Sequence, residues 1–127
     1  MATPVRGVAV TTRSFRKSVS HPDGELLVDF DTEAGDVTRF VVQLECWVGG
    51  DTEIVARFDH TPNYEQGHDV REEGLHMDIY RDGRKVDVET DELPGPVEPG
   101  FGLNFAINYL RAHDESLIVR YHRWRNE

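Results

Sequence analysis

Apolar and polar residues alternate along most of the first 90 positions, in runs that turn-forming residues separate. This period of two is typical of β-strands that bury one face. Turn signals at 21–24, 33–36 and 49–51 divide the runs, and Asp82-Gly83 is the strongest hairpin signal in the chain. The pattern predicts five consecutive strands between about residues 25 and 90, and a short strand at 8–12 is left as an open alternative. The inward positions are Leu26, Val28 and Phe30; Phe40, Val42, Leu44, Cys46 and Val48; Ile54, Ala56 and Phe58; and Leu75, Met77 and Ile79.

The C-terminal part changes to the helical period of 3.6 after a connector rich in proline and glycine at 94–100. Its apolar residues form two stripes, and His113-Asp114 between them predicts a helix break with Asp114 as an N-cap. We therefore expect two helices between about residues 101 and 126, with a strand at 116–124 as the alternative. The stripes are Leu103, Ala106, Ile107 and Leu110, and then Leu117, Ile118, Tyr121 and Trp124.

The order of these elements predicts a single α+β domain over residues 1–127. Five strands joined by short turns form an antiparallel meander, which buries one face and needs a cover for it. We expect the C-terminal helices to pack on that one face of the sheet. Trp47 lies on the opposite parity, where it would form a cleft wall or a dimer surface unless the N-terminal segment covers it.

Composition and charge narrow the classes of function. The 127 residues carry a net charge of −10, and residues 24–99 alone hold 20 acids against six bases. This acidic centre repels phosphate backbones, so we expect no DNA partner. No apolar run reaches the roughly 18 residues of a membrane helix, and no secretory signal is visible, so we expect a cytoplasmic protein without a membrane partner. The one cysteine, Cys46, excludes an internal disulfide, and its inward position predicts a buried, unreactive thiol.

The residues that could form a catalytic or binding site lie on the outward side of the third and fourth predicted strands. Polar residues alternate there with buried ones, and antiparallel pairing would bring two from each strand onto one exposed surface. The connecting segment from His60 to Gly74 is longer than most hairpin loops and rich in ionisable groups, as functional loops often are. We expect Arg57, Asp59, His76 and Asp78 on the exposed surface, and His60 and His68 in the loop beside it.

A metal site is the first of three interpretations of these residues. Three histidines recur every eight residues, and each has an aspartate next to it or two positions away. Imidazole and carboxylate ligands together suit zinc, manganese or iron and leave positions open for water. The sequence lacks the tight spacings of a zinc signature. The candidate ligands are His60, His68, His76 and Asp78.

Metal-free acid–base chemistry is the second interpretation. Histidine changes charge near neutral pH, so two histidines can act as general base and general acid. An arginine, Arg57 or Arg71, would stabilise the charge that develops on a phosphate. This is the residue set of a small metal-independent ribonuclease. In that arrangement His76 is the base, His60 or His68 is the acid, and Asp59 and Asp78 orient the imidazoles.

A purely structural network is the third interpretation. Arg57 would pair with Asp78 or Asp59 across the strands, and Asp69 would cap the long loop. Such cross-strand ion pairs on a solvated face each contribute about 0.2–1 kcal/mol. The same residues therefore allow a site or a set of stabilising contacts.

Three short segments carry a family resemblance. They are Phe58-Asp59-His60-Thr61-Pro62, Gly67-His68-Asp69-Val70 and Gly74-Leu75-His76-Met77-Asp78-Ile79-Tyr80. Over about residues 40–82 the chain resembles small uncharacterised prokaryotic proteins and, more loosely, the TumE-like proteins of toxin–antitoxin modules. Those carry an aspartate-x-x-proline segment at the end of one strand, which Asp59 and Pro62 match, and a histidine-x-histidine near the next. His76 matches the first of these histidines, Asp78 stands in place of the second, and His68 is the residue that would replace it.

The sequence leads to one functional expectation and two alternatives. The resemblance implies a small cytoplasmic, toxin-like domain, and the polar residues indicate cleavage of RNA phosphodiesters at a His/Asp/Arg site without an organic cofactor. The first alternative is a non-enzymatic interaction module that pairs with itself or with an antitoxin-like protein. The second is a metal-binding domain.

Overall fold

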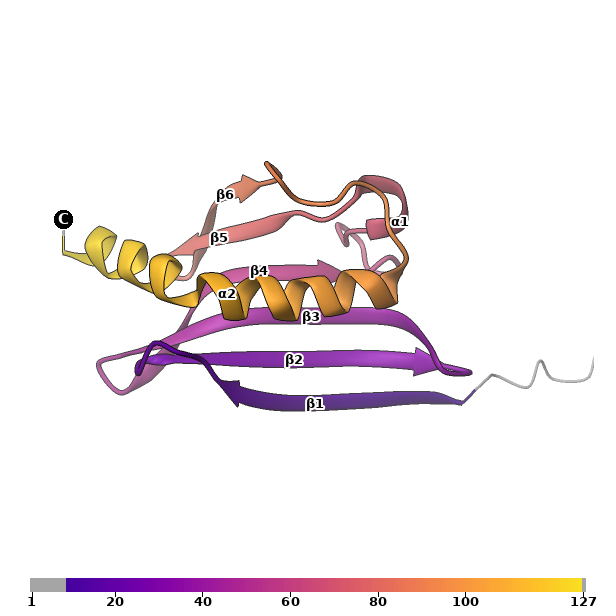
Figure 1. Cartoon of the computed structure of the whole chain (residues 1–127), viewed down its shortest axis with the longest axis horizontal. Helices are drawn as coiled ribbons and strands as arrows, with labels where there is room; N and C mark the ends of the chain where they lie inside the picture. The colour runs from indigo at the N-terminus through magenta and orange to yellow at the C-terminus, as the bar shows by residue number, and fades with distance from the viewer. Residues whose placement is uncertain (1–8, 127) are drawn as a thin grey trace, which may run out of the picture.

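The computed structural model describes residues 9–126, which form one six-stranded antiparallel sheet and two helices. The strands follow one another across the sheet in chain order, so the topology is a meander (Figure 1). The predicted α+β class and antiparallel meander are confirmed. The elements are β1 (Val10–Ser18), β2 (Gly24–Glu33), β3 (Asp36–Val48), β4 (Asp51–His60), α1 (Val70–Glu73), β5 (Met77–Arg81), β6 (Arg84–Glu89) and α2 (Pro99–Arg125).

The prediction of five strands is wrong by one, because β1 adds a sixth. It pairs along its whole length with β2, from Val10 opposite Glu33 to Ser18 opposite Glu25. All nine of its residues are exposed, since it lies at the sheet edge while α2 packs mainly over β3. A strand that buries neither face needs no apolar alternation, and the sequence shows none. The strand considered at 8–12 covers the start of β1, and Val8 lies outside the described residues.

The prediction of two C-terminal helices is also wrong, because α2 runs without a break from Pro99 to Arg125. Both predicted apolar stripes lie on its buried side, and they form one continuous stripe. The residue predicted to break the helix, Asp114, lies within that stripe and is 2% exposed. Its Oδ2 atom accepts a hydrogen bond of 2.8 Å from the backbone N–H of His21, so the carboxylate is satisfied although it is buried.

The core lies between α2 and one face of the sheet. In the view of Figure 1, α2 crosses this face with β5 and β6 above it and β1 and β2 below it. Most of the predicted inward positions are buried, but Phe30, Val48 and Ile54 are only partly buried. A register shift between Leu44 and Glu45 in the β3–β4 pair gives β4 an extra residue there, and Val55 is buried in place of Ile54.

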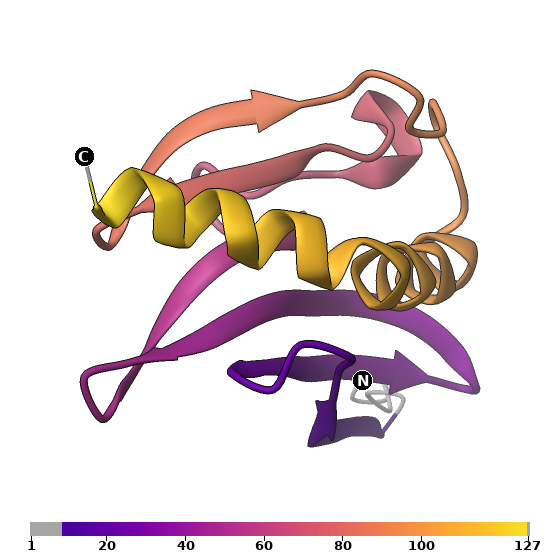
Figure 2. The ribbon, with the colours of Figure 1, turned by 60° about the vertical axis from the view of Figure 1, so that its left-hand side comes forward.

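Strands β4 and β5 are paired only briefly, through Ala56 opposite Ile79 and Arg57 opposite Asp78. Beyond these two pairs the connection from residue 61 to residue 76 leaves the sheet and contains the single turn of α1. The turned view in Figure 2 shows the β5–β6 hairpin and this connection on one side of α2, and β1 to β3 on the other. The fold therefore places the polar residues predicted as a site where the sheet is least continuous. No helix within residues 9–126 combines the length and the apolar character needed to cross a bilayer.

Candidate functional site

The first part of the β4–β5 connection folds back on itself and returns His68 to the end of β4. The N–H of Thr61 donates to the carbonyl of His68 at 2.8 Å, and two further turns join Tyr64 to Thr61 and Gly67 to Tyr64 at 3.1 and 2.9 Å. A Cβ atom at Gly67 would lie 1.8 Å from the carbonyl oxygen of Thr61, so this close return requires glycine. The loop therefore fixes the position of His68 beside Asp59.

Two carboxylates form the floor of the site, and they are buried rather than exposed as predicted. Asp59 is 8% exposed and Asp78 is 5% exposed. The hydroxyl of Thr61 donates to Oδ2 of Asp59 at 2.7 Å. Oδ1 of Asp78 is buried without a hydrogen-bond partner among the described residues, and the nearest cation, Nζ of Lys85, is 4.0 Å away. Burial raises the pKa of Asp78, and the nearby charges of Lys85 and His68 oppose this only in part.

His68 lies between these two carboxylates. Its Nε2 atom is 3.9 Å from Oδ1 of Asp59 and 3.8 Å from Oδ2 of Asp78. Both distances are too long for hydrogen bonds. The three side chains nevertheless offer ligand atoms that all lie within 4.8 Å of one another. Two oxygens and a nitrogen from β4, β5 and the connection between them thus lie close together.

Glu73, which is not among the predicted site residues, contacts the other side of the His68 ring. Its Oε2 atom is 3.3 Å from Nδ1 of His68 and 3.1 Å from Nε2 of His76, and the two rings are 4.6 Å apart. The contacts with His76 and then His68 lower the pKa of Glu73. A carboxylate against Nδ1 favours the tautomer with its proton there, which turns the Nε2 lone pair toward Asp59 and Asp78. In the sequence, Glu73 precedes His76 by three residues. This spacing indicates a contact only if the chain turns there, as it does at the end of α1.

The site opens into a cavity of about 260 Å³ on the side of the sheet opposite α2. Besides Asp59, His68 and Asp78, its walls include Arg57, Tyr80 and Lys85. Within residues 9–126 no ion pair joins Arg57 to Asp59 or Asp78, although Arg57 and Asp78 are opposite each other in the strand register. The predicted structural pairing of Arg57 is therefore not found, and its cationic side chain lies at the cavity wall.

The structure brings together most of the predicted site residues but not all of them. Arg57, Asp59, His68 and Asp78 share the cavity. His76, predicted on the fourth strand, precedes β5 and reaches the cluster only through its contacts with His68 and Glu73. The purely structural interpretation is right for Asp69, which caps α1 by accepting the N–H of Arg71 at 3.0 Å.

His60 does not belong to the cluster, which corrects its prediction as an acid or metal ligand in the loop. It is the last residue of β4 and is 1% exposed. The alternation that turns Phe58 inward also turns His60 inward, where its ring lies 5.9 Å from that of Phe40. Its Nδ1 atom accepts the N–H of Val70 at 3.1 Å, and burial lowers its pKa, so the ring is neutral and structural.

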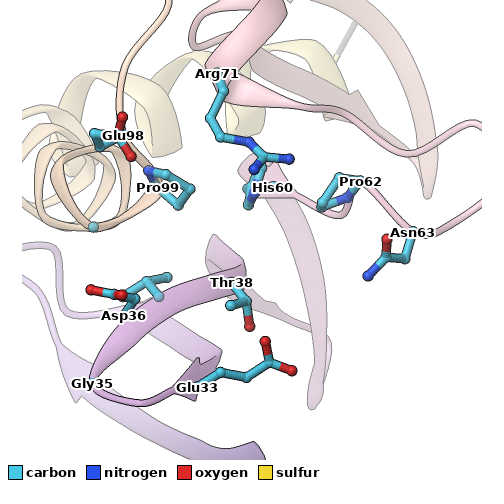
Figure 3. Close-up of a pocket in the computed structure, with 12 residues that line it drawn as sticks. Glu33, Gly35, Asp36, Thr38, His60, Pro62, Asn63, Arg71, Glu98 and Pro99 are labelled. Atoms are coloured by element: carbon cyan, nitrogen blue, oxygen red, sulfur yellow. The ribbon is translucent and has the colours of Figure 1, made fainter. Parts of the chain in front are cut away.

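His60 contributes instead to the wall of a larger cavity of about 660 Å³ beside the start of α2. Figure 3 shows Arg71 and His60 on one side of this cavity and Glu33 and Asp36 on the opposite side. Arg71 is already paired with Asp69 at 3.0 Å, and the acidic groups come from separate elements. This cavity is larger than the one at His68. Among the described residues, however, those that line it do not form a group of close ligand atoms.

The donor set at Asp59, His68 and Asp78 has the dimensions of a site for a divalent cation. Metal bonds to carboxylate oxygen and imidazole nitrogen are about 2.0–2.2 Å long, so two ligands of one ion lie up to about 4.3 Å apart. The Nε2-to-oxygen separations of 3.8 and 3.9 Å fall within that limit. The oxygen of Asp78 that faces His68 is Oδ2, whereas the unpaired Oδ1 atom lies 4.0 Å from Nζ of Lys85. The two distances from Nε2 of His68 allow one metal ion among the three side chains, and they are too long for a closed hydrogen-bond network.

Comparisons with known proteins identify the family but not an activity. No curated protein and no solved structure matches the chain. The resemblance to TumE-like proteins receives no support from these comparisons. Residues 10–127 match a family described as a domain of unknown function, DUF7718. The chain therefore belongs to the DUF7718 family, whose domain covers all the secondary structure described above.

Proposed function

We propose that this protein binds a divalent metal ion through Asp59, His68 and Asp78. The observation that carries the proposal is the position of the His68 Nε2 atom, 3.9 and 3.8 Å from two buried carboxylates that it does not hydrogen-bond. Buried carboxylates are costly without a partner, and one oxygen of Asp78 has none within the described residues. A cation bound by Oδ1 of Asp59 and Oδ2 of Asp78 would offset part of the cost of burying two carboxylates side by side.

The ligand types favour a particular class of ion. Two carboxylates and one imidazole suit manganese, iron or zinc, and their two negative charges balance a divalent ion. Three protein ligands leave positions for water, which a bound metal ion makes more acidic and more nucleophilic. The open cavity admits solvent and a small substrate to those positions. The chemistry that this arrangement supports is hydrolysis.

RNA phosphodiester cleavage, in a toxin-like role, is the second candidate function. It is favoured by Arg57 and Lys85, two cations that line the same cavity as His68 and that suit a phosphate group. His68 is the histidine placed to exchange a proton in this cavity, and His76 contacts only its ring and Glu73. The acidic surface around the cavity limits this candidate to short or single-stranded substrates that it admits.

A manganese titration tests the metal site. Metal-free protein prepared with EDTA is titrated with Mn²⁺, and electron paramagnetic resonance separates bound from free ion. We expect one ion per chain and at least about a tenfold weaker affinity in His68→Gln, because a ligand is lost. His113→Gln is the matched control, since His113 is exposed on α2 far from the cavity. Equal binding by wild type and His68→Gln contradicts the proposal.

An RNA incubation separates the two candidates. A mixed RNA pool is incubated with metal-free protein, with protein plus Mn²⁺, and with protein plus EDTA. Cleavage only with Mn²⁺ supports metal-dependent hydrolysis, whereas equal cleavage with EDTA supports metal-free chemistry at His68. Absence of cleavage in all three samples excludes the RNA candidate and leaves the metal site to the titration above.

A further inference from the structure

A second group of potential ligands lies far from the cavity, where the turn between β1 and β2 meets α2. His21 and Asp23 belong to this turn, and His122 lies near the C-terminal end of α2. One ligand atom from each side chain lies within 4.8 Å of the others. The rings of His21 and His122 are 6.0 Å apart, and Nε2 of His122 is 4.0 Å from Oδ2 of Asp23.

The turn holds its two side chains in fixed positions through three hydrogen bonds. The N–H of Gly24 donates to the carbonyl of His21 at 3.0 Å and closes the turn. The N–H of Trp47 donates to the carbonyl of Asp23 at 2.8 Å and joins the turn to β3. The N–H of His21 donates to Asp114 at 2.8 Å and joins the turn to α2. The backbone of the turn that carries His21 and Asp23 is therefore held in place by contacts that need no ion.

Close packing also brings the turn onto the helix. A Cβ atom at Gly24 would lie 2.6 Å from Cδ1 of Ile118 and 2.5 Å from Cγ2 of Val19. His122 follows Ile118 by four residues, one helical turn later, so it lies on the same side of α2 as this contact. The absence of a side chain at Gly24 is what allows His122 to approach the turn.

One ring nitrogen of His122 lacks a hydrogen-bond partner among the described residues. This Nε2 atom is buried, although the side chain as a whole is 34% exposed. The separation of 4.0 Å from Asp23 is too long for a hydrogen bond, but it is within the spacing of two ligands of one ion. This unpaired nitrogen on α2 resembles the unpaired Oδ1 atom of Asp78 on β5.

The ligand chemistry indicates which ion would bind. Nδ1 of His21 accepts the N–H of Asp23 at 3.1 Å, so Nε2 is the ring nitrogen of His21 that is left for a metal ion. Coordination through Nε2 of His21 moves its ring proton to Nδ1 and ends this hydrogen bond. Two imidazoles and one carboxylate favour zinc over the harder cations magnesium and calcium.

We propose that His21, Asp23 and His122 form a zinc site that fastens the β1–β2 turn to the C-terminal part of α2. The ion joins segments about 100 residues apart in the sequence, so its binding stabilises the folded chain. This site is independent of the cavity at His68, because the two share no residue and no secondary-structure element. The role that this position supports is structural, because the ion would join the β1–β2 turn to the C-terminal part of α2.

Zinc titration in a His68→Gln background tests this proposal without a contribution from the cavity. Calorimetry and thermal unfolding follow the addition of one equivalent of Zn²⁺. We expect binding and a higher unfolding temperature in His68→Gln and in His68→Gln/His113→Gln. We expect at least about a tenfold loss of affinity and no rise in unfolding temperature in His68→Gln/His122→Gln.

A second variant guards against a folding defect from the change at His122. Asp23→Asn in the same background alters a side chain that is 55% exposed, so the fold without metal is retained while a ligand is lost. Unchanged zinc binding and stabilisation in both the His122→Gln and the Asp23→Asn variants overturn the proposal. Failure of the Mn²⁺ titration removes the cavity site alone, since the zinc titration is carried out in proteins that already lack His68.

Discussion

At Asp78, folding favours the neutral carboxyl group, whereas the proposed metal binding requires the charged one. Burial raises the pKa of its carboxyl group, so the folded chain holds the proton more tightly than the unfolded chain does. Its contribution to stability is full below the unfolded-state pKa, which is about 3.9 for an aspartate, and is lost as the pH rises through the folded-state pKa. As the pH rises through the folded-state pKa the buried carboxyl group becomes charged, and Nζ of Lys85 at 4.0 Å offsets the cost of that buried charge only in part.

The change Asp78→Asn is expected to stabilise the metal-free protein and to abolish Mn²⁺ binding. The neutral amide has nearly the same shape and removes a buried charge, so we expect a gain of about 0.5–2 kcal/mol in the free energy of unfolding at pH 7. Urea unfolding measures the gain, which should shrink as the pH falls through the raised pKa of Asp78 and the wild-type carboxyl group becomes protonated. Asp91→Asn, at an exposed position, is the control and should change neither quantity. A less stable Asp78→Asn protein at pH 7 contradicts this view of the site.

Among the elements, α2 shows how one buried charge changes the interpretation of a sequence. An acidic residue in the middle of an apolar stripe is typical of a helix end, and Asp114 was predicted to be one. The helix continues because the N–H of His21, 93 residues earlier in the chain, donates to that carboxylate. Alternation and helical period can be recognised within a short stretch of sequence, whereas a contact with a residue 93 positions away cannot.

The change Asp114→Ala tests whether this contact supports the helix and the turn. It leaves the N–H of His21 without a partner in a buried place, which costs about 1–3 kcal/mol. We expect a corresponding loss in the free energy of unfolding, measured in urea, with α2 still a single helix by circular dichroism. Glu115→Ala removes the exposed neighbouring charge and should cost less than about 0.5 kcal/mol. Equal losses in the two variants would show that the buried contact is not important.

The same distinction explains which parts of the site the sequence could predict. Arg57, Asp59 and Asp78 follow from strand alternation, and the structure places them together. The same alternation turns His60 inward if β4 is continued by one residue, whereas the prediction ended the strand before His60 and placed it in the loop. The position of His68 depends on the backbone contacts of the 61–69 loop, and no period in the sequence encodes those contacts.

Burial is distributed unevenly across the whole molecule, and hydrogen exchange should reveal it. The strands β2 to β5 and α2 bury the core, while β1 and nearly all of β6 are exposed at the two sheet edges. We expect the slowest amide exchange in β3, β4 and the buried turns of α2, and the fastest strand exchange in β1 and β6. Mass spectrometry of peptides after deuterium labelling measures the order. Protection of β1 equal to that of β3 contradicts this picture.

The sheet is joined at its narrowest between β4 and β5, where two register pairs connect four strands to the β5–β6 hairpin. Asp59 belongs to one part and Asp78 to the other. An ion bound at the proposed site would join the two parts across this narrow connection, so its binding would stiffen the hairpin against the rest of the protein. The edge strand β6 would sense it directly, because Lys85 lies 4.0 Å from Asp78 and Val88 is paired with Asp78 in the sheet.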